Sequence, residues 1–110
     1  MTSPSKRKGD RAELEVQGML QDNLALTARR ALGAGRKDDI GDITGIPDTA
    51  IQVTNRQDLS SAITEKLPEL EQQMRNADAD FGALFCRRRG GSYIVVMTPD
   101  MWYAVMREAL

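Results

Sequence analysis

The hydrophobic period of the chain changes from helical to strand-like and back, and this alternation constrains the fold more than any other feature. Residues 9–24 and 58–77 carry apolar side chains at the spacing of an amphipathic helix. Residues 49–54, between them, alternate apolar and polar side chains as a half-buried strand does. A strand region between two amphipathic helices predicts a sheet flanked by helices, in an α/β or α+β fold. The apolar stripe of the first helix comprises Ala12, Val16, Met19, Leu20 and Leu24.

Further stretches complete a mixed sheet of about four to five strands. Residues 40–46 pair with residues 49–54 as a hairpin, because Pro47-Asp48 between them is typical of a turn. Pro68 falls inside the second helical pattern, so either that helix kinks there or a second helix begins there. The other expected elements are strands at residues 27–32, 81–86 and 92–97 and a last helix that Thr98 caps and Pro99 begins.

The length of the chain predicts a single domain. Its 110 residues are typical of one domain and too few for two ordinary ones. Residues 1–8 are rich in Ser, Pro, Lys and Arg and predict a flexible basic arm, and residues 9–110 form the expected domain. No stretch approaches the roughly 20 apolar residues of a membrane span, and the start does not read as a secretory signal. We therefore expect a soluble, cytoplasmic protein without a membrane partner.

The chain has no histidine and one cysteine, Cys86, and this restricts its chemistry. A disulfide within the chain is impossible, and zinc sites built from Cys and His are excluded as single-chain sites. Histidine-dependent acid–base catalysis and Ser-His-Asp triads are excluded as well. Any catalysis must come from carboxylates, lysine, arginine, tyrosine, hydroxyl groups or a metal held by oxygen ligands.

The charges are unevenly distributed, although the net charge is only −1. Basic residues gather near the N-terminus, on either side of a Gly-rich loop at residues 33–35, and in the run Arg87–Arg89. Local basic clusters on a nearly neutral chain suit a protein with one cationic face that meets a polyanion. The alternative is that each cluster is a solvated loop or tail.

At three places, polar residues interrupt or flank the apolar patterns of the expected helix and strands. Glu13 lies beside the apolar stripe of the first helix, and Asp42 lies between two glycines in a strand-like stretch. Gln52 and Thr54 share one face of the strand at residues 49–54. The alternatives are a surface acid for Glu13 and a turn-forming residue at a strand end for Asp42.

Taken in order along the chain, these residues resemble a known family. The segment Lys8–Glu15, the pair Arg29-Arg30 before a Gly-rich loop, and Gly41–Ile43 before a hydrophobic strand resemble the PD-(D/E)XK nucleases. Within them the chain is most similar to small phage and archaeal Holliday-junction resolvases. The resemblance covers about residues 6–97 and implies a restriction-endonuclease-like mixed sheet flanked by helices.

The resemblance also implies a catalytic site. In that family a Glu of the first helix, an Asp of the hairpin, and the Glu and Lys of the next strand gather at one edge of the sheet. The matching positions are Glu13, Asp42, Gln52 and Thr54, so the first two agree with the family and the last two depart from it. Glu13, Asp42 and, more weakly, Gln52 would hold Mg²⁺ or Mn²⁺, which prefer oxygen ligands.

Gln52 and Thr54 differ from the family in charge. Gln52 offers a neutral oxygen in place of a carboxylate, and Thr54 supplies no cation. Arg56 or Lys66 is a candidate substitute for the lysine, although arginine is poor at proton transfer. The spare carboxylates closest to Asp42 in sequence are those of Asp38, Asp39 and Asp48.

The resemblance implies branched or duplex DNA as the partner and a homodimer as the active form. The leading hypothesis is a phage-type Holliday-junction resolvase-like enzyme that hydrolyses phosphodiester bonds with Mg²⁺ in the host cytoplasm. The alternative is a catalytically impaired nuclease fold that serves as a DNA-binding or phage structural module, in a virion or its assembly. The residues expected to contact DNA phosphates are Lys6, Arg7, Lys8, Arg29, Arg30, Arg36 and Lys37.

Overall fold

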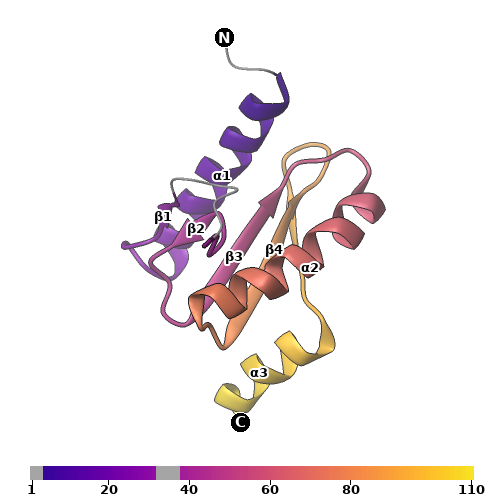
Figure 1. Ribbon diagram of the computed structural model, residues 1–110. Helices are drawn as coiled ribbons and strands as arrows, with labels where there is room; N and C mark the ends of the chain where they lie inside the picture. The colour runs from indigo at the N-terminus through magenta and orange to yellow at the C-terminus, as the bar shows by residue number, and fades with distance from the viewer. Residues whose placement is uncertain (1–3, 32–37) are drawn as a thin grey trace.

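The computed structural model describes residues 4–31 and 38–110. Its elements follow one another as helix, strand, hairpin, helix, strand pair and helix (Figure 1). Their bounds are α1 Pro4–Asn23, β1 Arg29–Arg30, β2 Ile43–Thr44, β3 Thr49–Thr54, α2 Leu59–Ala77, β4 Phe81–Arg87, β5 Tyr93–Val96 and α3 Pro99–Ala109.

The five strands form one mixed sheet in the order β1-β2-β3-β4-β5. β1, β2 and β3 pair antiparallel, with Ile43 opposite Ile51 in the expected hairpin. β3 and β4 pair parallel and α2 connects them, because a parallel pair needs a long crossover. β5 returns antiparallel to β4. The predicted fold class is confirmed: an α+β fold with a five-stranded mixed sheet flanked by helices.

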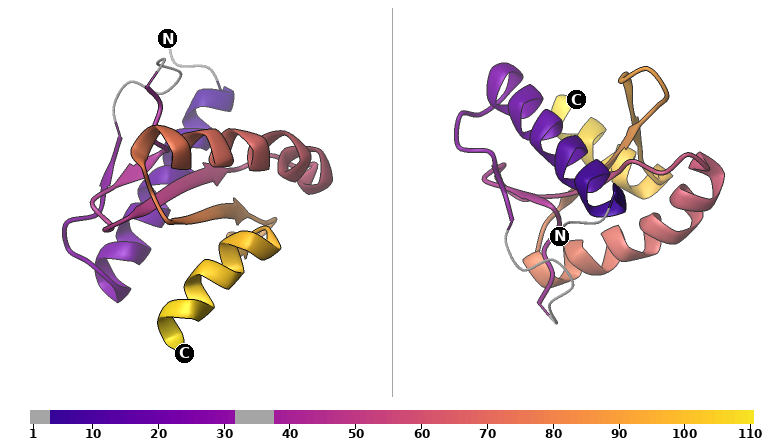
Figure 2. Two further views of the ribbon diagram at one scale, coloured as in Figure 1. Left: turned by 60° about the horizontal axis from the view of Figure 1, so that its bottom comes forward. Right: turned by 90° about the horizontal axis from the view of Figure 1, so that it is seen from above.

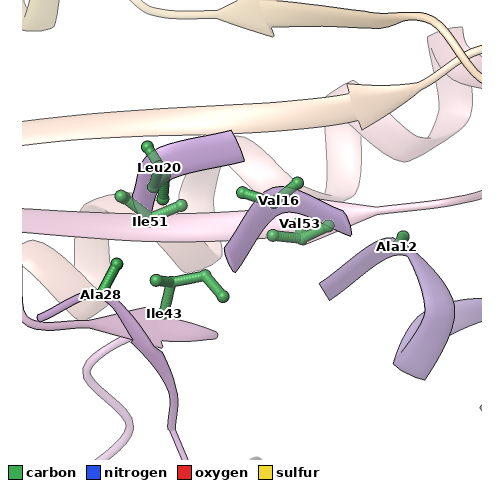
Figure 3. Packing of buried hydrophobic residues seen from close by; sticks show 7 residues of the cluster. All are labelled: Ala12, Val16, Leu20, Ala28, Ile43, Ile51 and Val53. Carbon is green, nitrogen blue, oxygen red and sulfur yellow. The ribbon is translucent and has the colours of Figure 1, made fainter. Parts of the chain in front are cut away.

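The alternation of side chains along β3 divides the core between the two faces of the sheet. Ile51 and Val53 point to the face that α1 covers, where they pack with Val16 and other apolar residues (Figure 3). Ala50 points to the opposite face and belongs to the cluster under α2. Figure 2 shows α1 and α2 on opposite sides of the sheet. Every second residue of β3 therefore faces α2, and this places Gln52 and Thr54 beneath that helix.

The helix boundaries differ in part from those expected. α1 begins at Pro4 rather than near Asp10, so residues 4–8 of the expected flexible arm are helical. Leu24 is 73% exposed because α1 ends at Asn23, and it does not join the core stripe. α2 is one continuous helix with Pro68 inside it, so no second helix begins there. The caps at Asp58 and Thr98 form as helix N-caps, with hydrogen bonds from the backbone N–H groups of Ser61 and Met101.

The two ends of the sheet have different surroundings. The start of α1, the β3–α2 connection and the β4–β5 turn lie together at the end where β3 and β4 finish (Figure 1). α3 lies near the other end, where β4 begins, and its Met101 packs into the cluster under α2. Trp102 and Tyr103 of α3 remain about half exposed, at 52% and 48%. Within the described ranges, no helix combines the length and the apolar character needed to cross a membrane.

Candidate functional site

Asp42 lies at the edge of the hairpin, just before β2. Its backbone N–H donates to the carbonyl of Ile51 at 2.7 Å, and its Oδ2 accepts a hydrogen bond from the backbone N–H of Val53 at 2.8 Å. Gly41 permits this approach, because its φ is +113° and a Cβ there would lie 2.8 Å from the Ile51 carbonyl oxygen. The backbone of the hairpin therefore holds the carboxylate against β3.

The carboxyl group of Asp42 is hard to ionise. Burial raises its pKa from 3.8 to about 6, although the hydrogen bond from Val53 acts in the opposite direction. The negative charges of Glu13 and Asp39 raise the pKa further, and the positive charge of Lys66 lowers it. A raised carboxyl pKa among like charges is typical of a functional site or of a place that receives a cation.

Gln52 lies almost completely buried under α2, with 5% of its surface exposed. Its Nε2 donates to Oε2 of Glu69 at 3.2 Å, and Lys66 donates to the same oxygen at 3.2 Å. Its Oε1 is buried without a hydrogen-bond partner. Such an oxygen costs free energy unless a donor or a cation meets it. Glu69 is a carboxylate beside this position that the sequence analysis did not identify.

Thr54 is buried as well, with 4% of its surface exposed, and it lines a hollow together with Lys66. Of the two substitutes considered for the lysine expected at Thr54, Lys66 acts electrostatically on Asp42. Both are ion-paired, Arg56 with Glu65 and Lys66 with Glu69, so the action on Asp42 is what distinguishes them. The structure therefore favours Lys66 as the cation of this site.

Glu13 is paired with a cation rather than free. Arg30 contacts its Oε1 at 3.4 Å and also binds Oδ1 of Asp10 at 2.7 Å. Burial raises the pKa of Glu13, and the charge of Arg30 acts against this rise. Glu13 is close enough to Asp42 to raise the pKa of Asp42. The positive charge of Arg30 offsets part of the negative charge of Glu13.

Among the spare carboxylates, Asp39 lies close to the site. Its Oδ2 accepts a hydrogen bond from Nε2 of Gln73 at 2.9 Å, and its Oδ1 accepts from the N–H of Gly41 at 2.9 Å. Gln73 is 2% exposed, and its Oε1 has no partner either. Asp48 is in the β2–β3 turn with a φ of +54°, and Asp38 is exposed.

The residues near Asp42 would hold a magnesium ion only if the ion kept part of its water shell. Nowhere in residues 4–31 and 38–110 do three acidic or thiol side chains lie close enough to hold a metal by themselves. Mg²⁺, however, is usually bound by one or two carboxylates together with water and substrate phosphate. Asp42 supplies a carboxylate, and the unpartnered Oε1 of Gln52 is an oxygen in need of a partner. Glu69, at hydrogen-bonding distance from Gln52, adds negative charge.

A basic groove lies at the end of the sheet where β3 and β4 finish. Its volume is about 410 Å³, six of its ten lining residues are Lys or Arg, and none is acidic. It shares Lys8, Asn55, Arg56 and Gln57 with an adjoining hollow of about 560 Å³, which extends to Thr54. We call this surface the basic groove; it is lined by Lys8, Arg11, Asn55, Arg56, Gln57, Leu59 and residues 87–90.

Most of the residues expected to contact DNA lie elsewhere. Lys8 lines the basic groove and Arg7 is exposed, whereas Lys6 pairs with Asp10 at 3.0 Å. Arg29 donates to the backbone carbonyl groups of Leu26 and Ala28, each at 2.7 Å. Arg30 is held by Asp10 and Glu13 as described above. The expected contacts Arg36 and Lys37 lie outside the described residues.

The cations of the basic groove that were not assigned to DNA contact from the sequence come from three separate segments. Arg11 is on α1, Arg56 follows β3, and Arg87–Arg89 end β4 and begin the turn after it. The arginine run was visible in the sequence. Its position opposite α1 depends on where β4 lies in the sheet, and no local pattern gives that order.

Comparison of the chain with protein-family models, with curated proteins and with solved structures gave no match.

Proposed function

We propose that the protein is a metal-dependent DNA endonuclease of the Holliday-junction resolvase kind, which hydrolyses phosphodiester bonds in branched DNA. The observation that carries this proposal is the position of Asp42. This half-buried, hard-to-ionise carboxylate is held against the backbone of Val53, the residue that follows the buried Gln52 on β3. Val53 and Thr54 line the hollow that continues into the basic groove, so an anionic backbone in the groove would approach the carboxylate.

In this proposal Asp42 and Gln52 hold Mg²⁺ or Mn²⁺, with Glu69 next to them. When bound, the metal polarises the scissile phosphate and lowers the pKa of a bound water. Lys66 offsets the negative charge that gathers there, as it already does for Asp42. Its contact of 3.2 Å with Glu69 keeps the ammonium group on this side of α2. Glu13 contributes negative charge that Arg30 partly offsets.

Nicking of a four-way DNA junction with Mg²⁺ or Mn²⁺ tests the proposal. We expect wild-type protein to nick the junction and Asp42→Asn to lose the activity. The matched control is Asp48→Asn, which removes an exposed carboxylate from the β2–β3 turn at a left-handed residue where asparagine is well tolerated. The enzyme hypothesis fails if the wild-type protein cuts no DNA with either metal.

A second function, DNA binding without hydrolysis, is favoured by two observations. Gln52 is an amide where the nucleases that the chain resembles have a carboxylate, and Glu13 is paired with Arg30. Electrophoretic mobility shifts without metal distinguish the hypotheses. Binding of junction or duplex DNA by a protein that never nicks it supports the second function, and absence of binding at moderate salt contradicts both.

A homodimer would let one assembly contact two arms of a DNA junction, one with each subunit. The exposed side chains of Trp102 and Tyr103 on α3 are the candidate contact. Light scattering after size exclusion, with Trp102→Ser as the variant, tests this part of the proposal. A monomeric mass for the wild-type protein at micromolar concentration would contradict it.

A further inference from the structure

The basic groove brings together charges that are far apart in the sequence. One wall is α1, which contributes Lys8 and Arg11, and the opposite wall is the β4–β5 turn. The β3–α2 connection contributes Asn55 and Arg56. Figure 1 shows these three segments at the same end of the molecule, and the second view of Figure 2 looks onto that end.

Only part of this positive charge is offset by acids. Glu15 accepts from Arg87 at 2.7 Å and lies 3.6 Å from Arg11, and Glu65 pairs with Arg56. Within the described chain, no ion pair joins Lys8, Arg88 or Arg89 to an acid. Arg88 and Arg89 are both exposed. The groove thus has a net positive charge and cations that no described acid neutralises, although Nε of Arg88 donates to Oγ of Ser92 at 3.3 Å.

We propose that the basic groove binds the phosphodiester backbone of a nucleic-acid strand by charge, without reading its bases. Five of the six cations are arginines, whose planar guanidinium group matches phosphate oxygens with two parallel hydrogen bonds. The lining has no aromatic residue, so no base can stack on an aromatic ring there. Asn55 and Gln57 add neutral amides that hydrogen-bond to phosphate or sugar oxygens.

The shape and composition argue against other polyanionic partners. The groove is concave, and Leu59 is its single aliphatic side chain, so it has no apolar surface to enter a membrane. Arginine forks pair with carboxylates as well as with phosphates, but an acidic peptide presents its carboxylates on flexible side chains at irregular spacing. The regular spacing of a phosphate backbone suits cations arranged along a trough.

The direction of the groove links this inference to the candidate site. Lys8, Asn55, Arg56 and Gln57 also line the hollow that reaches Thr54 and Lys66. A strand lying in the groove is therefore directed toward Thr54 and Lys66, and Lys66 acts electrostatically on Asp42. This last step rests on the proposed function, whereas binding in the groove does not.

Fluorescence anisotropy of a labelled single strand of about 12 nucleotides tests the inference. The titration is made in EDTA, so that hydrolysis plays no part, at several salt concentrations from about 50 to 200 mM. The test variant is Arg88→Ala with Arg89→Ala. Both side chains are exposed. The variant loses the bond of 3.3 Å from Nε of Arg88 to Oγ of Ser92 but keeps the backbone hydrogen bond of 2.7 Å between the same residues, so we expect the fold to be preserved.

We expect the double variant to bind several-fold more weakly and its salt dependence to be shallower by about 1.4, because two contacts to a single strand are lost. Arg88→Lys with Arg89→Lys should recover part of the affinity. The matched control is Arg75→Ala with Arg107→Ala, which removes two charges from the surface between α2 and α3. The control should bind like the wild-type protein.

Equal loss in the test and control variants would show a general charge effect and overturn the inference. Stronger competition by poly-glutamate than by an unlabelled strand, or capture by anionic vesicles but not by DNA, would also overturn it. Competition by millimolar inorganic phosphate as effective as that of the strand would reduce the site to a single-anion pocket and contradict a backbone track. If the double variant nicks DNA normally, the proposed binding in the groove is wrong but the enzyme hypothesis stands. If the wild-type protein binds the strand in the groove but never nicks DNA, the enzyme hypothesis is wrong but the groove proposal stands.

Discussion

The carboxylate of Asp42 accepts a hydrogen bond of 2.8 Å from the backbone N–H of Val53. This bond occupies one carboxylate oxygen and extends the contact between β2 and β3 beyond the short β2 strand. The group is therefore part of the hairpin as well as part of the candidate site. Its ionisation has consequences for stability that can be measured without any substrate.

The first prediction concerns pH. The folded-state pKa of Asp42, about 6, lies above its ordinary value of 3.8. Between these values the folded protein holds a proton that the unfolded chain releases, so this group makes the protein less stable as pH rises. The full effect is reached above about pH 6 and amounts to roughly 3 kcal/mol or less. Urea unfolding in EDTA measures it.

Asp42→Asn isolates this contribution, because asparagine can still accept the hydrogen bond from Val53 and does not titrate. The wild-type protein should lose stability relative to the variant between about pH 4 and pH 7. Asp10 and Glu15 have lowered pKa values and act in the opposite direction, but they are common to both proteins. A constant difference across this range would show that the Asp42 carboxyl titrates normally.

The second prediction concerns Gln52→Glu. Without metal the variant should melt at a lower temperature, because a new carboxylate replaces an amide that lies 3.2 Å from Glu69 and donates to it. With Mg²⁺ its melting temperature should rise by more than that of the wild-type protein, since the ion then has a further carboxylate ligand. Differential scanning calorimetry in EDTA and in Mg²⁺ measures both effects.

Gln72→Glu is the control for that experiment, since Gln72 is exposed on α2, the helix that carries Glu69. Mg²⁺ should change its melting temperature no more than that of the wild-type protein. An equal rise in the two variants would point to general screening of charge and would count against a metal site at Gln52.

The third prediction compares two glycines. Gly18 lies within α1 and has nothing within 4 Å of the position of a Cβ, so Gly18→Ala should stabilise the protein by about 0.5–1 kcal/mol. Gly45 has a φ of +97°, and a Cβ there would collide with the backbone carbonyl of Thr27. Gly45→Ala should therefore destabilise by more than about 1 kcal/mol. Chemical denaturation of both variants tests the described path of the hairpin.

The fourth prediction concerns the link between α1 and the β4–β5 turn. Oε1 of Glu15 accepts hydrogen bonds of 2.7 Å from Arg87 and from the hydroxyl of Tyr93. Arg87 is only 14% exposed, and burial and Glu15 raise the pKa of Tyr93. Glu15→Gln should lower the urea midpoint by more than Glu108→Gln, which changes an exposed acid of α3. Equal midpoints would show that this network contributes no stability.

Glu15→Gln should also change binding of a strand in the basic groove, because Glu15 contacts the β4–β5 turn. Glu15 carries a negative charge beside the groove, so its loss would strengthen binding if only charge mattered. If the network positions the turn, the gain should be smaller than that of Glu65→Gln, which also frees an arginine. Parallel anisotropy titrations of the two variants separate the two effects.

Local patterns predicted the elements with strong periodicity and failed where long-range packing decides. The alternation at residues 49–54 gave β3 with its bounds, and Thr98 and Pro99 gave the start of α3. Pro68 left two alternatives open, and only the packing of Leu70 and neighbouring residues under one continuous helix decides between them. The short strands β1 and β2 are set by pairing with β3, so their bounds are not visible in their own sequences.

The candidate site shows the same division. Asp42 and Gln52 could be selected from the sequence because each is polar in a strand-like context. Glu69 could not, because on α2 it looks like any exposed helical acid until the crossover places it beside Gln52. The pairing of Arg30 with Glu13 depends on the contact between α1 and β1, which no spacing rule provides.

The bond between Glu15 and Arg87 joins residues 72 positions apart, and it lies at the wall of the basic groove. During synthesis α1 emerges long before β4 and its turn, so the early chain carries Lys8 and Arg11 on a helix with no facing wall. The groove exists only when the latest strands have folded back onto the earliest helix. A nascent or truncated chain would lack the assembled groove, and occupancy of the groove would report that folding is complete.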